Sequence, residues 1–374
     1  MVVEHVLTVP QGTFTLERAH HDPGEPLRAW DAADELALAH LAETGAAGER
    51  WLVVDDAHGA LATALAPHGP ASWTDSVVSM AATRANLERN GIDASAVTLV
   101  PSTSDPSGPV DVAIVKVPRT LAVLEDVLHR LRPLLHAGSV VVGAGMTKAV
   151  HRSTIAAFER AVGPTPTSLA RKKARLLLAS LDPALEPGPA PGPLRWATPE
   201  GIQVTGLPGV FSASSLDPGT RLLLDHLPDV GPGAVVVDLG CGTGVVAATV
   251  AHRHPEAALV CCDDSFRAVA AARRTVGALA PDATFHVTDV LDGVADASAD
   301  LVLCNPPFHA GGARTTSVAH RMFEGSARVL RPGGTLTVVA NRHLGHHVAL
   351  RRWFDDVAVV GSDPRFVVLR GRRA

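Results

Sequence analysis

The sequence predicts an α/β protein of two tandem, Rossmann-like domains with mostly parallel sheets, and three observations support this. Apolar, β-branched runs alternate with helical segments along most of the 374 residues, which indicates doubly wound sheets. A stretch rich in Pro and Gly, residues 181–194, separates two halves of similar size. Segments of the two halves also correspond in order, which indicates a duplication.

The second half shows the alternation most clearly. We expect strands at 234–240, 257–264, 283–289, 299–305 and 333–341, helices at 244–254, 267–280 and 315–330, and a closing antiparallel hairpin at 354–370. The resulting domains are 1–180 and 201–374, joined by a linker at 181–200.

The first half repeats this plan without its most characteristic residues. "DVAIVKVP" aligns with "DLVLCNPP" at an offset of 189, and "GSVVVGAG" aligns with "GTLTVVAN" at an offset of 196. The second half would therefore carry seven extra residues, about 309–315, for which we expect a loop. Where the second half has a glycine-rich loop and Asn305, the first has "DDAHGA" and Lys116. We therefore expect the N-terminal copy to be degenerate.

Basic residues are concentrated locally, although the net charge of −5 gives no global footprint for nucleic acid. Residues 147–175 hold seven Lys or Arg and a single acid, Glu159. We expect "SLARKKARLLL" (168–178) to form a helix that docks through its leucines and exposes its cations. The alternative is an ordinary solvated face. The candidate RNA contacts are Lys148, Arg171, Lys172, Lys173, Arg175 and Arg314.

Several other classes of protein and site are disfavoured. No apolar run approaches the ~20 residues of a membrane span, and residues 1–22 lack the features of a secretion signal. We expect a cytoplasmic monomer without a membrane partner. The four cysteines lack zinc-type spacing, and the histidine pairs His252/His254 and His346/His347 lack further ligands, so no metal is expected.

A glycine-rich turn, "VVVDLGCGTGVV", joins the first strand and helix of the second half. Glycine lets the backbone take positive φ and approach a ligand closely. The alternative is a tight strand–helix turn with no ligand. The loop residues expected to bind a ligand are Asp238, Gly240, Cys241, Gly242 and Gly244.

The surroundings of this turn favour S-adenosylmethionine over a dinucleotide. A dinucleotide loop would have glycine where this chain has Val245. The carboxylate of Asp238 would repel a pyrophosphate but suits a cationic amino-acid group. Asp263 ends the next strand, where a carboxylate can bind ribose hydroxyls, and Asp289 could accept from an adenine amine.

The NPPF segment, Asn305, Pro306, Pro307 and Phe308, follows the fourth strand of the second half. It therefore lies at the carboxyl edge of the sheet, where open α/β sheets bind ligands. The Asn305 side-chain oxygen and the Pro306 carbonyl can accept hydrogen bonds from one exocyclic amine and stabilise positive charge on its nitrogen. Phe308 offers a face for stacking a base. A merely rigid strand exit is the alternative.

The second half resembles class I S-adenosylmethionine-dependent methyltransferases, and the whole chain resembles bacterial rRNA guanine-N2 methyltransferases. The motifs that carry this likeness include "LRAWDAADELALAHL", "PGVFSASSLDPGTRLLLDHLP", "DLGCGTG", "CNPPFH" and "VANRHL", and the tail looks closest to the large-subunit (23S) branch. The small-subunit (16S) branch stays open. The resemblance implies that Phe211 and Asn305 also lie at the donor pocket, and that Asn305 to Phe308 hold the target guanine.

Two rival functions remain. A protein glutamine methyltransferase would also use an NPP segment, but it leaves the first half and its basic segment unexplained. A non-catalytic RNA-binding assembly factor would explain the basic segment, but not the intact glycine loop and NPPF.

Overall fold

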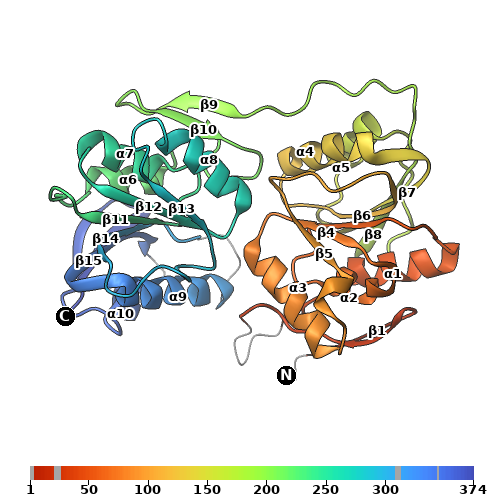
Figure 1. Cartoon of the computed structure of the whole chain (residues 1–374), viewed down its shortest axis with the longest axis horizontal. Helices are drawn as coiled ribbons and strands as arrows, with labels where there is room; N and C mark the ends of the chain where they lie inside the picture. The colour runs from red at the N-terminus through yellow and green to blue at the C-terminus, as the bar shows by residue number, and fades with distance from the viewer. Residues whose placement is uncertain (1–3, 21–26, 308–312, 343–344) are drawn as a thin grey trace. The chain divides into compact units, whose positions relative to one another are not determined.

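The computed structural model describes residues 4–20, 27–307, 313–342 and 345–374. Its contacts divide the chain into two units, Met1–Gly192 (unit 1) and Pro193–Ala374 (unit 2). Each unit has helices on both faces of a mostly parallel sheet (Figure 1). Among the described residues, no helix is both long and apolar enough to cross a membrane.

Unit 1 contains a six-stranded sheet in the order β5-β4-β3-β6-β7-β8, with β8 antiparallel to β7. A separate hairpin, β1-β2, precedes it. The strands are β1 Val6–Val9, β2 Gly12–Thr15, β3 Trp51–Val54, β4 Ala71–Thr74, β5 Thr98–Pro101, β6 Val110–Lys116, β7 Leu135–Met146 and β8 Ala174–Ala179. The α-helices are α1 Ala32–Thr44, α2 Ala60–Ala64, α3 Val77–Arg89, α4 Leu121–Leu131 and α5 Arg152–Ala161, with short 3-10 helices at Ala66–His68, Ala94–Ala96 and Arg132–Leu134.

Unit 2 repeats this order and adds one edge strand, giving β13-β12-β11-β14-β15-β17-β16. A hairpin, β9-β10, again precedes the sheet. The strands are β9 Leu194–Ala197, β10 Gln203–Gly206, β11 Val235–Leu239, β12 Ala258–Asp263, β13 Thr284–Val287, β14 Ala299–Cys304, β15 Leu330–Asn341, β16 Ala358–Ser362 and β17 Phe366–Arg372. The α-helices are α6 Pro218–Asp225, α7 Val245–Arg253, α8 Phe266–Val276, α9 Ala313–Val329 and α10 His346–Leu350.

Equivalent helices in the two units begin in the same way. An aspartate N-cap starts α1 and α6, a serine N-cap starts α3 and α8, and a left-handed glycine precedes α2 and α7. Each aspartate or serine cap accepts, through its side chain, hydrogen bonds from backbone N–H groups of the first turn, which would otherwise lack partners. These matches extend the duplication from strand order to single residues. The caps are Asp31 and Asp217, Ser76 and Ser265, and Gly59 and Gly244.

Strand pairing corrects the alignment of the two halves by one residue. Val110 pairs with Leu135 in unit 1, and Ala299 pairs with Leu330 in unit 2. The offsets are therefore 189 and 195, and unit 2 has six extra residues rather than seven. The similarity of Gly-Ser to Gly-Thr displaced the sequence alignment, whereas ladder hydrogen bonds fix the true register. Helix α9 already begins at Ala313, so the end of the expected 309–315 loop is helical; residues 308–312 lie outside the described residues.

The prediction of a helix at residues 168–178 is wrong. Residues from Ala174 onward form β8, which pairs antiparallel with β7, and a Thr167–Leu177 bridge extends the hairpin. Leu176 and Leu177 are buried, whereas Leu169 is 87% exposed, so one apolar helix face does not exist. Ladder hydrogen bonds and burial against β7 outweigh the helix propensity of the Ala, Arg, Lys and Leu residues.

The linker expected at 181–200 is also partly structured, because β9 lies within it and pairs with β10. The boundary between the two units, between Gly192 and Pro193, lies within the predicted linker and just before β9.

Candidate active site

The carboxyl ends of three adjacent strands of unit 2 bring the predicted donor and target residues together. Leu239 of β11 pairs with Cys262 of β12 on one side and with Cys304 of β14 on the other. The residues that follow these three strands therefore meet at one edge. Asp263 ends β12 and Asn305 follows β14, which places both beside the glycine loop after β11.

The glycine loop is held by backbone hydrogen bonds from the neighbouring strand. The N–H groups of Gly240 and Cys241 donate to the Cys262 carbonyl at 2.8 and 3.0 Å. A Cβ at Gly244 would lie 2.8 Å from the Ala272 Cα, so glycine is required there for packing of α7 on α8. At Gly242 (φ 53°) the nearest atom that a Cβ would meet among the described residues is the Phe211 carbonyl oxygen, at 3.6 Å. Space beside Gly242 is therefore open to a ligand.

Asp238 is a buried carboxylate beneath the start of α7. Its Oδ2 accepts from the Ala247 N–H at 3.0 Å. Burial raises the pKa of the Asp238 carboxyl to about 7, the Ala247 hydrogen bond opposes this, and the charge of Asp263 adds to the rise. A nearby cation would favour the ionised form. Asp238 is therefore poised to pair with a cationic ligand group.

Asp263, not Asp264, faces the glycine loop. Its Oδ2 accepts from the Gly242 N–H at 2.9 Å and its Oδ1 from the Ser265 N–H at 3.0 Å. Asp264 is exposed. Since a carboxylate offers about four lone-pair positions, Asp263 can accept hydroxyl donors beyond these two amides.

Three further residues predicted to bind the methyl donor differ in their burial and in their contacts. Asp289 follows β13 and forms an ion pair with Arg321 of α9 at 2.5 Å, so one of its oxygens is engaged by a cation. The Phe211 side chain is 53% exposed, while its carbonyl lies near Gly242. Cys241 is buried in the core, so it can contribute only its backbone to the loop surface.

The amide of Asn305 contacts Thr220, which was not among the predicted site residues. Its Nδ2 donates to Thr220 Oγ1 at 2.9 Å. Its Oδ1 is buried and has no hydrogen-bond partner among the described residues. Pro306 is buried and Pro307 is exposed; Phe308 lies outside the described residues. A buried acceptor without a partner costs free energy unless a ligand supplies a donor.

Lys116 of unit 1 occupies the position equivalent to Asn305, at the offset of 189 that relates β6 to β14. Its ammonium donates to Asp34 at 2.5 Å and to Asp31 at 3.0 Å. Burial raises the pKa of Asp34 to about 6, with Lys116 opposing the rise. A salt-bridged cation thus replaces the amide, which agrees with the expected loss of chemistry in unit 1.

The predicted basic residues of unit 1 cluster at a tight turn rather than on a helix. Lys172 and Lys173 have left-handed backbones (φ 48° and 63°), and Arg171 and Ala174 exchange both backbone hydrogen bonds. These are the features of a two-residue hairpin turn that favours Asn-Gly. The Thr147 N–H donates to the Lys173 carbonyl at 2.7 Å, which brings the exposed Lys148 beside the turn.

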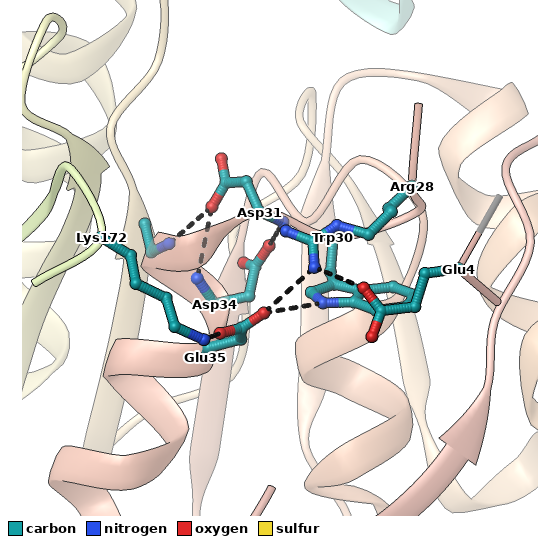
Figure 2. Close-up of polar contacts among 8 residues, drawn as sticks. Glu4, Arg28, Trp30, Asp31, Asp34, Glu35 and Lys172 are labelled. Atoms are coloured by element: carbon teal, nitrogen blue, oxygen red, sulfur yellow. Dashed lines mark hydrogen bonds and ion pairs between the residues drawn. The ribbon is translucent and has the colours of Figure 1, made fainter. Parts of the chain in front are cut away.

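Two of these cations already have acidic partners. Lys172 contacts Glu35 at 2.7 Å, and Glu35 also accepts from the indole of Trp30 (Figure 2). Arg171 lies 3.6 Å from Glu43. Lys173 is exposed, whereas Arg175 is half-buried in β8. Arg314 lies in α9, but its side chain is not among those that the structure describes.

Potential metal ligands do not gather in the described parts of the chain. No group of three or more His, Cys, Asp or Glu residues there could hold a metal ion. The four cysteines are free and buried.

Comparison with known proteins matches each unit to a family model. Residues 4–183 match the RLMG N-terminal domain, and residues 201–370 match the Methyltransferase small domain. The structure is similar to that of a T. thermophilus 16S rRNA N2 G1207 methyltransferase in complex with AdoMet and guanosine, with a TM-score of 0.77, 24% identity, and coverage of 99% of this chain and 97% of that one. This likeness confirms the predicted methyltransferase fold.

Full-length relatives are considerably more similar in sequence. The ribosomal RNA large subunit methyltransferase G of Streptomyces coelicolor is 52% identical over 373 residues, which cover 97% of this chain and 99% of that protein. The protein of the same name from Pseudomonas aeruginosa strain UCBPP-PA14 is 43% identical over 370 residues, covering 98% and 99%. The predicted resemblance, including its large-subunit branch, is thereby confirmed: the chain belongs to the ribosomal RNA large subunit methyltransferase G family.

Proposed function

We propose that this chain transfers a methyl group from S-adenosylmethionine to the exocyclic N2 of a guanine in large-subunit ribosomal RNA. The single observation that carries the proposal is the buried Asn305 Oδ1, which lacks a partner among the described residues and lies beside the glycine loop. The two relatives described above, both named ribosomal RNA large subunit methyltransferase G, supply the substrate. Such a substrate implies action in the cytoplasm, where ribosomes are made.

The residues of unit 2 fit the methyl donor. Open space beside Gly242 admits a ligand close to the backbone, Asp263 can accept from ribose hydroxyls, and Asp238 can pair with the amino-acid ammonium. S-adenosylmethionine, when bound, supplies an electrophilic methyl group. Asp289 remains a candidate acceptor for the adenine amine, although it must share its carboxylate with Arg321.

Asn305 and Pro306 act on the target amine. The N2 lone pair of guanine is delocalised into the ring, so the amine is a poor nucleophile. Acceptance of its N–H groups by Asn305 Oδ1 and the Pro306 carbonyl favours a tetrahedral nitrogen and stabilises the positive charge that develops there. The excess proton can then leave to water, so no strong base is required.

Unit 1 is proposed to bind the RNA backbone through the hairpin turn at Lys172 and Lys173, called the lysine turn below. Left-handed φ angles are unfavourable for lysine and favourable for glycine, yet both turn positions hold lysine. The presence of two charged residues at strained positions supports a function for them. Lys148 and Lys173 are expected to contribute most to phosphate binding. Arg171 and Lys172 must first give up their ion pairs with Glu43 and Glu35 before they can contact phosphates.

The test is methylation of protein-free rRNA. Purified chain, S-adenosylmethionine and a mixture of deproteinised 16S and 23S rRNA are incubated, and N2-methylguanosine is mapped by mass spectrometry. We expect a single modified guanine, in 23S rRNA. Asn305→Ala should lower the single-turnover rate on the order of 10²-fold while donor affinity stays within about twofold.

Other outcomes would support the rival functions. Methylation of a glutamine in ribosomal protein, with none in RNA, would favour the protein methyltransferase. Absence of donor binding by calorimetry would favour the assembly factor. A near-normal rate for Asn305→Ala would remove Asn305 from the mechanism.

A further inference from the structure

We propose that Thr220 is a positioning residue that decides which end of the Asn305 amide meets the target base. The inference rests on the proposed function, because it assigns a role within the same site. Thr220 is the third residue of α6 and is 4% exposed. Its hydroxyl oxygen accepts from Asn305 Nδ2 at 2.9 Å.

The two ends of an amide have nearly the same shape and opposite hydrogen-bonding character. The oxygen accepts and the nitrogen donates. If the Asn305 amide turned over, its N–H groups would face the N–H groups of the guanine amine, and the acceptor needed for catalysis would be lost. A threonine hydroxyl can donate or accept, and in this structure it accepts from Asn305 Nδ2, which leaves Oδ1 for the substrate.

The Thr220 hydroxyl is well placed for this task because the start of α6 is fixed. The Thr220 N–H donates to the N-cap carboxylate of Asp217 at 2.9 Å, which stabilises the first helical turn. Asn305 follows the buried strand β14, so its backbone is also fixed. Thr220 therefore lies in a capped helix and Asn305 directly after a buried strand, which is the kind of support that a positioned catalytic amide requires.

Unit 1 provides an internal comparison for this contact. Asp34 is the third residue of α1 after the Asp31 cap, as Thr220 is of α6 after the Asp217 cap. Asp34 accepts from Lys116, the equivalent of Asn305. The same two backbone positions thus form a donor–acceptor pair in both units.

The two pairs differ in what they leave available. Lysine has only donors, so the unit 1 pair offers no acceptor at the strand end. The amide of unit 2 satisfies its donor on Thr220 and keeps its acceptor. The residue at the third position of the helix therefore matches the residue at the end of the strand. An aspartate carboxylate accompanies the lysine in unit 1, and a threonine hydroxyl accompanies the proposed catalytic amide in unit 2.

The orientation can be measured without turnover, because the chain contains four asparagines, Asn86, Asn90, Asn305 and Asn341. In full-length protein labelled with ¹⁵N at asparagine, four side-chain NH₂ signals are expected, and Asn305→Ala identifies the one from Asn305. Thr220→Val, which keeps the shape but removes the hydroxyl, should shift that signal and speed its exchange with water. Thr220→Ser should leave it close to wild type.

The catalytic consequence is tested by a double-mutant cycle under single turnover. Thr220→Val should slow methyl transfer on the order of 10-fold, and Thr220→Ser should stay within about threefold. Donor affinity should be unchanged in both, which also shows that the variants are folded; Thr220→Ala is the substitute if valine prevents folding. In the Asn305→Ala background, Thr220→Val should cost no more than about twofold, since its effect acts through Asn305.

Two results would overturn the inference. One is an Asn305 amide signal that is identical in wild type and Thr220→Val. The other is an additive effect of the two substitutions on rate. If the wild-type chain methylated no guanine, the proposed function would fail by itself, and the amide signals would still decide whether Thr220 orients Asn305.

Discussion

At the residue scale, each unit buries a carboxylate beneath the helix that follows its first central strand. Asp238 accepts from the third residue of α7, Ala247, and Asp56 accepts from the third residue of α2, Ala62, at 2.9 Å. The two aspartates come from different positions in the aligned loops, since the offset that relates Gly59 to Gly244 places Asp56 opposite Cys241. A carboxylate at this helix start complements the helix dipole. Unit 1 has therefore kept the electrostatics of the loop and the glycine before its helix, but it has no counterparts of Gly240 and Gly242.

The raised pKa of Asp238 predicts a pH dependence of donor binding. With a pKa of about 7, the carboxyl is largely neutral at pH 6 in the free protein and ionised at pH 8. A cationic donor group binds the ionised form, so affinity should fall as pH drops through 7, with up to one proton released per donor bound at pH 6. Isothermal titration at pH 6 and 8, in buffers of different ionisation enthalpy, measures both quantities.

The matched control is Asp238→Asn, which should bind the donor weakly and with no such pH dependence. Its stability provides a second check with a defined sign. Between about pH 4 and 7 the wild-type native state holds a proton that the unfolded chain has lost, so wild-type stability falls as pH rises through this window. The stability of Asp238→Asn relative to wild type should therefore increase from pH 5 to 8. Equal pH profiles for the two proteins would contradict the assignment.

At the element scale, the sequence predicted the strands and long helices of unit 2 because buried parallel strands read as continuous apolar runs. Segment 168–178 failed because its composition suits a helix while its partner, β7, lies far away in the sequence. The duplication could have predicted the strand, because the equivalent of Ala174 in unit 2 is Phe366, which lies in a segment that was predicted to be a strand. Thr220 was missed for a related reason, since its contact spans 85 residues and its equivalent in unit 1 is an aspartate.

The lysine turn leads to a prediction about RNA binding. Lys173→Glu should raise the dissociation constant for rRNA and reduce the slope of log affinity against log salt by roughly one, because one phosphate contact is lost. Lys172→Glu should add to this effect, since it places a second carboxylate beside Glu35. Binding of fluorescent rRNA fragments across a salt series measures the slope.

A control with the same charge change comes from another element of unit 1. Arg160 on α5 pairs with Glu125 at 2.8 Å, and Arg160→Glu changes the net charge by the same amount as Lys173→Glu. It should leave the salt slope unchanged. If both variants weakened binding equally, net charge rather than the turn would govern RNA affinity.

At the scale of the whole molecule, the two units are similar folds with separate cores. Each hydrophobic cluster draws its buried members from a single unit: three from unit 1, and three from unit 2. The duplicated strand order and caps show that both units share one architecture. Six extra residues and a glycine loop accompany the proposed chemistry in unit 2, while a salt-bridged lysine fills the equivalent position in unit 1.

Separate cores and the proposed donor site in unit 2 predict that the donor stabilises only part of the molecule. At a donor concentration of about 100 times the dissociation constant, binding adds roughly 2.7 kcal/mol to the unit that binds it. For a unit of this size the unfolding transition should rise by roughly 5–10 °C. Calorimetry with hydrogen exchange read by mass spectrometry assigns each transition to peptides of residues 1–192 or 193–374.

Lys116→Ala should lower the unfolding temperature of unit 1 alone, because it leaves the buried Asp34 without its cation. A single transition that the donor and Lys116→Ala shift together would mean that the two units unfold as one.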